Sequence, residues 1–310
     1  MEKITLRKEQ KKRLIKRNIP LVALTLPGFL NILLFTYMPM FGVVIAFKDY
    51  SYARGIFGSA WAGFKHFEFF FSSNDAAVVI RNSILYSVAF HILATFCSVL
   101  VALLLYEVRS KLALKVYQTV TIVPYFISWV LVAYIGFSLF SNRFGILNTA
   151  IEALGGTPIE WYAEPKYWPF ILAFFHVWKG TGMSCILYYA TLMGIDPSLF
   201  EAAKIDGATK WQCIRHVSIP ALIPVISIVS IMAVGSIMGG DFGLFYQVPR
   251  DSGALYPVTD IIATYTYRGL QAGNMSQTAA VGLFQSVVGL VLVLATNLTI
   301  RKVSPENALF

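Results

Sequence analysis

Six long apolar blocks divide the sequence, and their length limits the folds open to the chain. They lie at roughly residues 20–47, 82–106, 117–140, 168–192, 219–240 and 279–300. About 20 apolar residues in a helix span the hydrocarbon core of a bilayer. Because lipid cannot satisfy backbone N–H and C=O groups, each block is expected to be helical. The pattern predicts an all-α polytopic membrane protein with six transmembrane helices.

The composition leaves no room for a separate soluble domain. Charged residues make up 13% of the 310 residues, about half of the usual ~25% in globular proteins. The net charge of +9 does not point to nucleic acid, because eight basic residues lie within the first 17 positions, beside an apolar block. Such a run typically faces the cytoplasm, next to anionic lipid headgroups.

The distribution of basic residues also predicts the topology. With residues 1–19 inside, the inner segments are 1–19, 107–116, 193–218 and 301–310, and they hold sixteen of the 25 lysines and arginines. This bias agrees with the positive-inside rule. We therefore expect a basic cytoplasmic N-terminus at 1–19, one six-helix domain at 20–300, and a cytoplasmic tail at 301–310. The segment 193–218 is expected in the cytoplasm, and residues 1–19 do not resemble a cleavable signal.

Motifs for chemistry by this chain alone are absent from the sequence. The three cysteines, Cys97, Cys185 and Cys213, are far apart, and the four histidines lack metal-ligand spacing. No phosphate-binding loop, nucleophile elbow, HExxH motif or pair of carboxylates on one helix face occurs. We expect no enzymatic activity and no cofactor bound by this chain.

Lys179 is the clearest ionisable residue inside an apolar block. Ionisable groups within a membrane usually face a cavity or a partner. His176 and Met183 fall on the same helix face as Lys179, and Gly180 beside them permits a close approach. One interpretation is a solute-binding face suited to a hydroxyl-rich or anionic solute. The other is that Lys179 pairs with a carboxylate elsewhere in the bundle.

The fifth block carries a second candidate face. Ala233, Ser236 and Gly240 have helical spacing, and Asp241 follows at the outer edge. Small residues of this kind serve helix packing as readily as solute contact. Trp129 and Tyr134, in the third block, can stack on a sugar ring, although ordinary bundle packing is the simpler explanation for them.

The stretch from Glu201 to Pro224 is the longest polar interval between the later blocks. Asp196-Pro197 provides a helix N-cap and first turn. A short helix over 198–204, a turn at Gly207 and a second helix over 208–217 are expected. A helix–turn–helix of this size is either a docking element or an ordinary connection between spans.

The order and spacing of this stretch resemble the EAA motif of ABC-importer permeases, with their type I importer fold. The matching residues are Glu201, Ala202, Ala203, Asp206, Gly207, Ala208, Trp211, Gln212, Pro220 and Pro224. In that family the EAA loop is a cytoplasmic coupling helix that sits in a groove of the ATPase subunit. The resemblance implies that Glu201 and Asp206 make polar contacts or caps there. Ala202, Ala203 and Ala208 would fit the groove, with Gly207 at the bend.

The resemblance extends along nearly the whole chain, to the carbohydrate-uptake branch of these permeases. The segments DFGLFYQVPRDSGALYPVTDIIATYTYRGL, AAVGLFQSVVGLVLVLATN and PENALF are similar to LplB-type permeases of polysaccharide-degradation loci. Those are associated with the import of complex oligosaccharides, often plant-derived or uronate-containing. By offset from the EAA loop, the resemblance places the sugar path at His176, Lys179, Gly180, Met183, Ser236 and Gly240.

The resemblance also implies the assembly. A second homologous permease, two ATPase subunits that bind ATP and Mg²⁺, and an extracytoplasmic solute-binding protein would complete a multi-pass importer of the bacterial cell membrane. A permease for another solute, such as an amino acid or a phosphate ester, remains an alternative. A secondary transporter is a further alternative, but it would need buried carboxylates on several spans, and the sequence has none.

Overall fold

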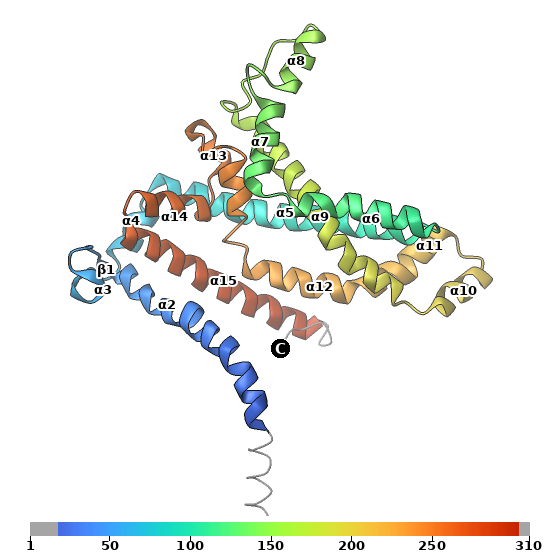
Figure 1. Cartoon of the computed structure of the whole chain (residues 1–310), viewed down its shortest axis with the longest axis horizontal. Coiled ribbons are helices and arrows are strands. Elements are labelled where there is room, and N and C mark those ends of the chain that lie inside the picture. Colours follow the sequence, from blue (N-terminus) through green and yellow to red (C-terminus); the bar gives the residue numbers. More distant parts are fainter. Residues whose placement is uncertain (1–17, 304–310) are drawn as a thin grey trace, which may run out of the picture.

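The computed structural model describes residues 18–303. Most of the basic segment 1–19 and of the tail 301–310 lies outside these residues. Figure 1 shows a bundle of long helices with short elements at its ends. The long helices are Asn18–Phe47, which contains η1 (Leu33–Tyr37), α2 (Met38–Met40) and η2 (Phe41–Phe47), then α5 (Asn74–Tyr106), α6 (Lys111–Phe126), α7 (Trp129–Phe140), α9 (Trp168–Met193), α12 (Ile219–Gly235) and α15 (Met275–Val303).

Five predicted apolar blocks are long, continuous helices in the described residues. Each of these helices is long and apolar enough to cross a membrane. Their bounds agree with the predicted blocks to within a few residues at most ends. Two starts differ most. The helix that contains α12 begins at Lys210 rather than near residue 219. Helix α5 begins at Asn74 rather than near residue 82, because Ser73 accepts a hydrogen bond from the Ala76 N–H and caps an earlier first turn.

The third block, expected as one helix over 117–140, is broken in two. Helices α6 and α7 meet at an angle of 96°. Pro124 removes a backbone donor near the end of α6, and Ile127 and Ser128 are extended. The Ser128 hydroxyl then accepts from the Leu131 N–H and starts α7 as a new helix. The chain therefore turns sharply where a straight span was predicted.

Helix α9 is the central element of the bundle. It packs along α5 and against α6, while α15 packs against α12, α14 (Ile262–Gln271) and η2. Gly182 in α9 faces the backbone of α6 so closely that an added Cβ would lie 1.8 Å from the Thr121 carbonyl oxygen. An apolar cluster that includes Trp168, Leu172 and Phe175 fills the space between α9 and the segment 244–261.

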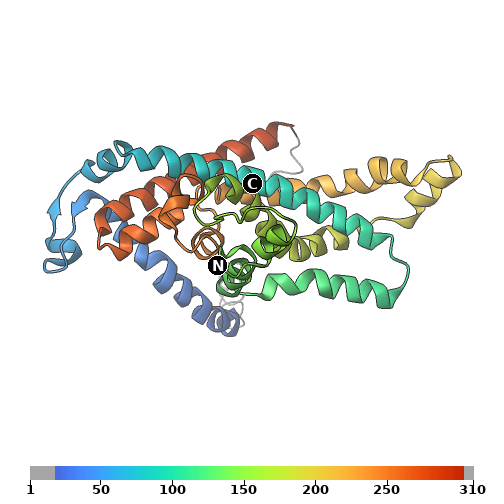
Figure 2. The same ribbon diagram turned by 90° about the horizontal axis from the view of Figure 1, so that it is seen from above.

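Short elements lie at the ends of the elongated bundle. In Figure 2 the yellow helices α10 (Pro197–Ile205) and α11 (Lys210–Cys213) form one end, and a blue two-stranded sheet lies at the opposite end. The strands β1 (Lys48–Asp49) and β2 (Ala60–Trp61) are antiparallel. The remaining short elements are α3 (Gly55–Gly58), α4 (Lys65–Phe71), α8 (Ile146–Ala153), η3 (Pro165–Tyr167), η4 (Ile214–Ser218), η5 (Gly243–Gln247), η6 (Gly253–Leu255) and α13 (Tyr256–Thr259).

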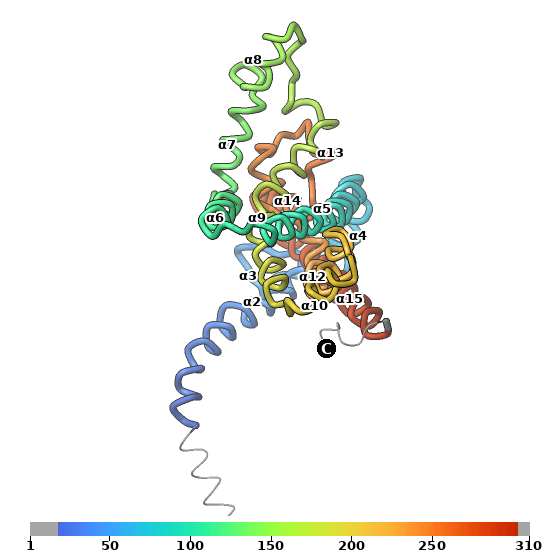
Figure 3. Tube along the Cα trace, turned by 90° about the vertical axis from the view of Figure 1, so that its right-hand side faces the viewer, coloured from blue at the N-terminus to red at the C-terminus, as the bar shows by residue number. Residues whose placement is uncertain are grey.

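Two parts of the chain project away from the bundle. Figure 3 shows α7 and α8 extending in one direction and the first helix diverging in the other. In its most apolar window the helix Asn18–Phe47 is only 6% buried. Its apolar side chains are therefore available to lipid or to another membrane subunit.

Candidate functional site

The polar stretch around Glu201 forms a compact helix–turn–helix at one end of the bundle. Asp196 caps α10 as predicted, with its Oδ1 accepting from the Ser198 N–H at 2.9 Å. That backbone N–H lowers the pKa of the Asp196 carboxyl. Pro197 occupies the first turn of α10. The predicted N-cap is thus confirmed.

A glycine in the left-handed region ends α10. Gly207 has φ +78°. The Ala208 N–H donates to the Ala203 carbonyl at 2.9 Å, and the Gly207 N–H donates to the Lys204 carbonyl at 3.0 Å. This pair of bonds is the Schellman arrangement, which requires a residue that tolerates positive φ. Gly207 therefore makes the bend, as the sequence predicts.

The second helix starts later than expected and is continuous with the next span. Thr209 and Gln212 form a reciprocal capping box at the start of α11. The helix then runs without a break from Lys210 through η4 to Gly235. A movement of this loop is consequently transmitted directly to α12.

The loop presents an open surface. Glu201, Ala202 and Asp206 are exposed, whereas Ala203 and Ala208 are half-buried. Apolar side chains also face outward, with Ile205 86% and Trp211 66% exposed. Exposed apolar groups of this kind are typical of a surface that another protein covers.

The loop is tied to the end of α5. The Lys210 ammonium lies 2.6 Å from Glu107 Oε2. A cavity of about 340 Å³ lies between the two segments, with Glu201, Lys204 and Ala208 among its walls. The loop and the C-terminal end of α5 thus form one surface. The charge bias predicts that this surface faces the cytoplasm.

Most candidate solute residues line two adjoining cavities within the bundle. One, of about 450 Å³, is lined by Trp129, His176, Lys179, Gly180 and Asp241, with residues of the α6–α7 break. The other, of about 240 Å³, is lined by His176, Ala233, Ser236, Gly240 and Asp241, with residues of α5. The two predicted helix faces therefore meet, and His176 and Asp241 border both cavities.

The Lys179 ammonium is held by backbone carbonyls rather than by a carboxylate. It donates to the carbonyl oxygens of Tyr125 and Ile127, both at 2.6 Å, and to that of Pro124 at 3.4 Å. It also lies 5.2 Å from the centre of the Trp129 ring. The Pro124 carbonyl also accepts from the Ile127 N–H at 3.2 Å. At the break, where a helix end leaves carbonyls without intrahelical donors, Lys179 donates to the Tyr125 and Ile127 carbonyls.

Asp241 lies at the outer edge of α12. Burial raises the pKa of its carboxyl, while the backbone N–H groups of Leu244 and Gly243 and the charge of Lys179 act in the opposite direction. Its Oδ1 accepts from the Leu244 N–H at 3.2 Å. Lys179 lies in α9, whereas Asp241 lies in the segment between α12 and η5.

The remaining candidates lie elsewhere. Met183 is 47% exposed and is not among the residues that line these two cavities. Tyr134, five residues after Trp129 in α7, is 66% exposed and lines a separate cavity of about 250 Å³ with Tyr246 and Arg250. The sequence did not single out Arg250, because it falls in a long loop between apolar blocks.

The sequence comparisons identify the family. Residues 94–305 match the family model described as the binding-protein-dependent transport system inner membrane component. The chain belongs to this family. The permease is therefore an integral membrane transport subunit of an ABC importer, in which ATP hydrolysis resides on a separate subunit.

Relatives match over nearly their full length. The permease is 35% identical over 294 residues to Protein LplB of Bacillus subtilis, covering 94% of this chain and 92% of LplB. It is 36% identical over 314 residues to the polygalacturonan/rhamnogalacturonan transport system permease protein YteP of the same organism, covering 99% and 96%. The expected resemblance to carbohydrate ABC permeases is confirmed.

Solved structures share the fold. A subunit of a bacterial ABC transporter that imports the acidic polysaccharide alginate superposes with a TM-score of 0.87 at 32% identity, covering 95% of this chain and 99% of the other. A subunit of the alginate transporter in complex with its alginate pentasaccharide-bound periplasmic protein gives 0.85 at 32% identity, with 94% and 97% covered. The type I importer permease fold is thereby shown.

Proposed function

We propose that this permease forms one half of the membrane channel of an importer for uronate-containing oligosaccharides. The observation that carries this proposal is the full-length similarity to permeases for two acidic polysaccharides, polygalacturonan/rhamnogalacturonan and alginate. The paired cavities support it, because they combine the aromatic ring of Trp129 with the polar groups of His176, Ser236 and Asp241. Pockets that combine apolar walls with a few polar groups are typical ligand sites.

The assembly follows from the same relationship. An extracytoplasmic solute-binding protein delivers the sugar, as a periplasmic protein binds the alginate transporter. A second, homologous permease completes the channel as a heterodimer, and two ATPase subunits bind ATP and Mg²⁺. The exposed apolar helix Asn18–Phe47 offers a surface for the second permease or for lipid. Both termini and the loop 193–218 face the cytoplasm of a bacterial cell.

The helix–turn–helix around Gly207 acts as the coupling element. Ala202, Ala203 and Ala208 leave a smooth surface for an ATPase groove, while Glu201 and Asp206 provide polar contacts. ATP binding closes the ATPase subunits and moves this loop. Because α11, η4 and α12 form one continuous helix, the movement reaches the cavity wall at Ala233 and Ser236. Hydrolysis resets the bundle, and transport proceeds by alternating access.

Reconstitution tests this proposal. The permease, its co-purifying subunits and the binding protein are placed in vesicles, and uptake of radiolabelled trigalacturonate is measured with and without internal ATP. We expect uptake only with ATP and the binding protein together. Uptake by this chain without an ATPase would establish a secondary transporter instead. Uptake of neutral oligosaccharides, amino acids or phosphate esters, with none of trigalacturonate, would overturn the proposed substrate class.

A further inference from the structure

Two consecutive residues at the mouth of a cavity have an uncommon backbone. Arg250 and Asp251 have φ values of 58° and 48°, and they are the only non-glycine residues with positive φ within residues 18–303. This region is disfavoured for side chains with a Cβ. Such backbone persists where its surroundings enforce it, and it is concentrated at binding sites.

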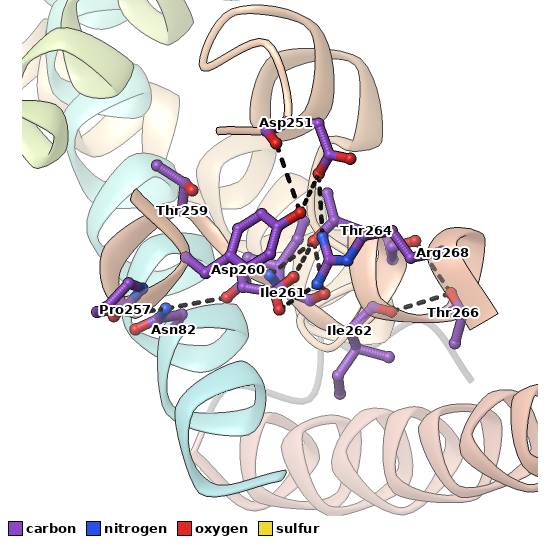
Figure 4. Close-up of polar contacts among 12 residues, drawn as sticks. Asn82, Asp251, Pro257, Thr259, Asp260, Ile261, Ile262, Thr264, Thr266 and Arg268 are labelled. Atoms are coloured by element: carbon purple, nitrogen blue, oxygen red, sulfur yellow. Dashed lines mark hydrogen bonds and ion pairs between the residues drawn. The ribbon is translucent and has the colours of Figure 1, made fainter. Parts of the chain in front are cut away.

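Several contacts hold this backbone in place. Asp251 Oδ1 accepts from Arg268 Nη1 at 3.2 Å and from Tyr256 Oη at 3.1 Å. Arg268 also pairs with Asp260, so that it lies between the two carboxylates (Figure 4). The Ser252 hydroxyl donates to the Tyr162 carbonyl at 3.1 Å. This network fixes the position of Asp251, and it thereby holds the backbone of the preceding residue, Arg250.

The Arg250 guanidinium has no carboxylate partner among the described residues. Its central carbon lies 4.2 Å from the centre of the Phe137 ring, and no Asp or Glu oxygen lies within 4.0 Å. Two other basic side chains described above already have partners, because Lys179 bonds to backbone carbonyls and Arg268 to two carboxylates. The exposed Arg250 guanidinium, by contrast, donates no side-chain hydrogen bond to a carboxylate or a carbonyl within residues 18–303.

The cavity beside Arg250 has the size and walls of a site for one sugar ring. Its volume is about 250 Å³, and its walls include Tyr134, Tyr246 and Gln247. Ligand pockets usually measure ~300–1,000 Å³, so this space suits a single ring rather than a longer chain. Tyrosine faces offer apolar contact to a sugar, and an amide offers hydrogen bonds.

We propose that Arg250, Tyr134 and Tyr246 form a subsite that binds the carboxylate-bearing ring of a uronate. The guanidinium fork matches a carboxylate with two parallel hydrogen bonds. The Phe137 face fixes the guanidinium plane, and the tyrosines contact the ring. This inference rests on the proposed transport of acidic oligosaccharides, and it names the side chain that distinguishes acidic from neutral rings. Arg268 serves as a positioning residue through Asp251.

The experiment compares an acidic ligand with a neutral ester of the same sugar chain. Trigalacturonate and its fully methyl-esterified form are transported by the complete importer in vesicles, and KM and kcat are measured for Arg250→Gln and Arg250→Lys. We expect Arg250→Gln to raise KM for trigalacturonate about tenfold or more, as for a lost charge-assisted bond, and to leave the ester unchanged. Arg250→Lys should recover part of the loss. Arg143→Gln, an exposed arginine before α8, is the control and should change neither.

Each other outcome overturns the subsite. Equal effects on both ligands would place Arg250 in contact with the binding protein rather than with the sugar carboxylate. If the variant changes the transport of neither ligand, Arg250 does not contact the transported sugar. If the unsubstituted importer transports neither ligand, the proposed function fails, and the subsite fails with it. If it transports trigalacturonate and Arg250→Gln does so equally well, only the subsite fails.

Discussion

Lys179 in α9 caps the broken end of α6, with its ammonium 2.6 Å from the Ile127 carbonyl oxygen. The same ammonium lines the cavity of about 450 Å³. A single side chain therefore joins the break between α6 and α7 to the candidate solute path. If a solute draws Lys179 away, the carbonyls at the break lose this donor, and we expect the angle between the two helices to change.

Replacing Lys179 tests this link. Lys179→Met removes the donor from the Tyr125 and Ile127 carbonyls. Hydrogen bonds to charged groups contribute about 1.5–3 kcal/mol, so the variant should lower the thermal midpoint of the purified importer. Lys179→Arg keeps the charge and donors and should retain most of the stability. An unchanged midpoint with lost transport would mean that Lys179 acts on the solute and not on the helix break.

The apolar pattern predicted the spans but not the direction of the chain within one of them. Length and hydropathy predict that residues 117–140 lie in the membrane. They do not predict that Ser128 caps a new helix within this block. Pro124 and Ser128 were the only sequence signals for the break. They did not decide the prediction, because a proline within a membrane helix is often tolerated. The two-residue strands β1 and β2 were also missed, because strands this short leave no period in the sequence.

The conformation of the candidate site could be predicted where it depends on residues that are adjacent in the sequence. Asp196 and Gly207 occupy their predicted places because caps and positive φ depend on adjacent residues. Arg250 was not predictable, because its backbone depends on Arg268 and Tyr162, which lie far away in the sequence. The partners of Lys179 were missed for the same reason, since carbonyls at a break carry no sequence signal.

Gly180 and Gly182, two positions apart in α9, allow the effect of helix packing to be tested separately from the effect on transport. A Cβ at Gly182 would overlap the Thr121 carbonyl, whereas Gly180 has nothing within 4 Å and faces the cavity. Gly182→Ala should therefore disrupt the contact between α6 and α9 and lower expression of folded protein. Gly180→Ala should fold normally, since alanine favours a helix by about 1 kcal/mol over glycine. We expect it to slow transport by narrowing the cavity. Size-exclusion profiles and uptake rates check both, and equal folding of the two variants would contradict the close packing.

Asn148 holds the projecting loop around α8. Its amide donates to the Ile159 carbonyl at 2.9 Å, and its Oδ1 accepts from the Ile159 N–H and the Trp161 indole. Asn148 is 3% exposed and its partners are partly buried, so Asn148→Ala leaves their polar groups unsatisfied at a cost of about 1–3 kcal/mol. Glu152→Ala, at an exposed position of α8, is the matched control. Hydrogen exchange should accelerate over residues 142–161 in Asn148→Ala alone, and uniform protection in both variants would contradict this role.

The turn at Gly207 gives the sharpest test of coupling. Proline cannot adopt φ +78° and lacks the N–H that bonds to the Lys204 carbonyl, so Gly207→Pro should distort the loop while the bundle stays folded. Glu201→Lys reverses an exposed charge on the same surface. Both variants should abolish uptake and weaken binding of the ATPase subunits. Gly207→Asn is the control, because asparagine tolerates this region and an added Cβ has open space. ATPase activity that still responds to the binding protein in the Gly207→Pro importer would show that coupling runs through another surface.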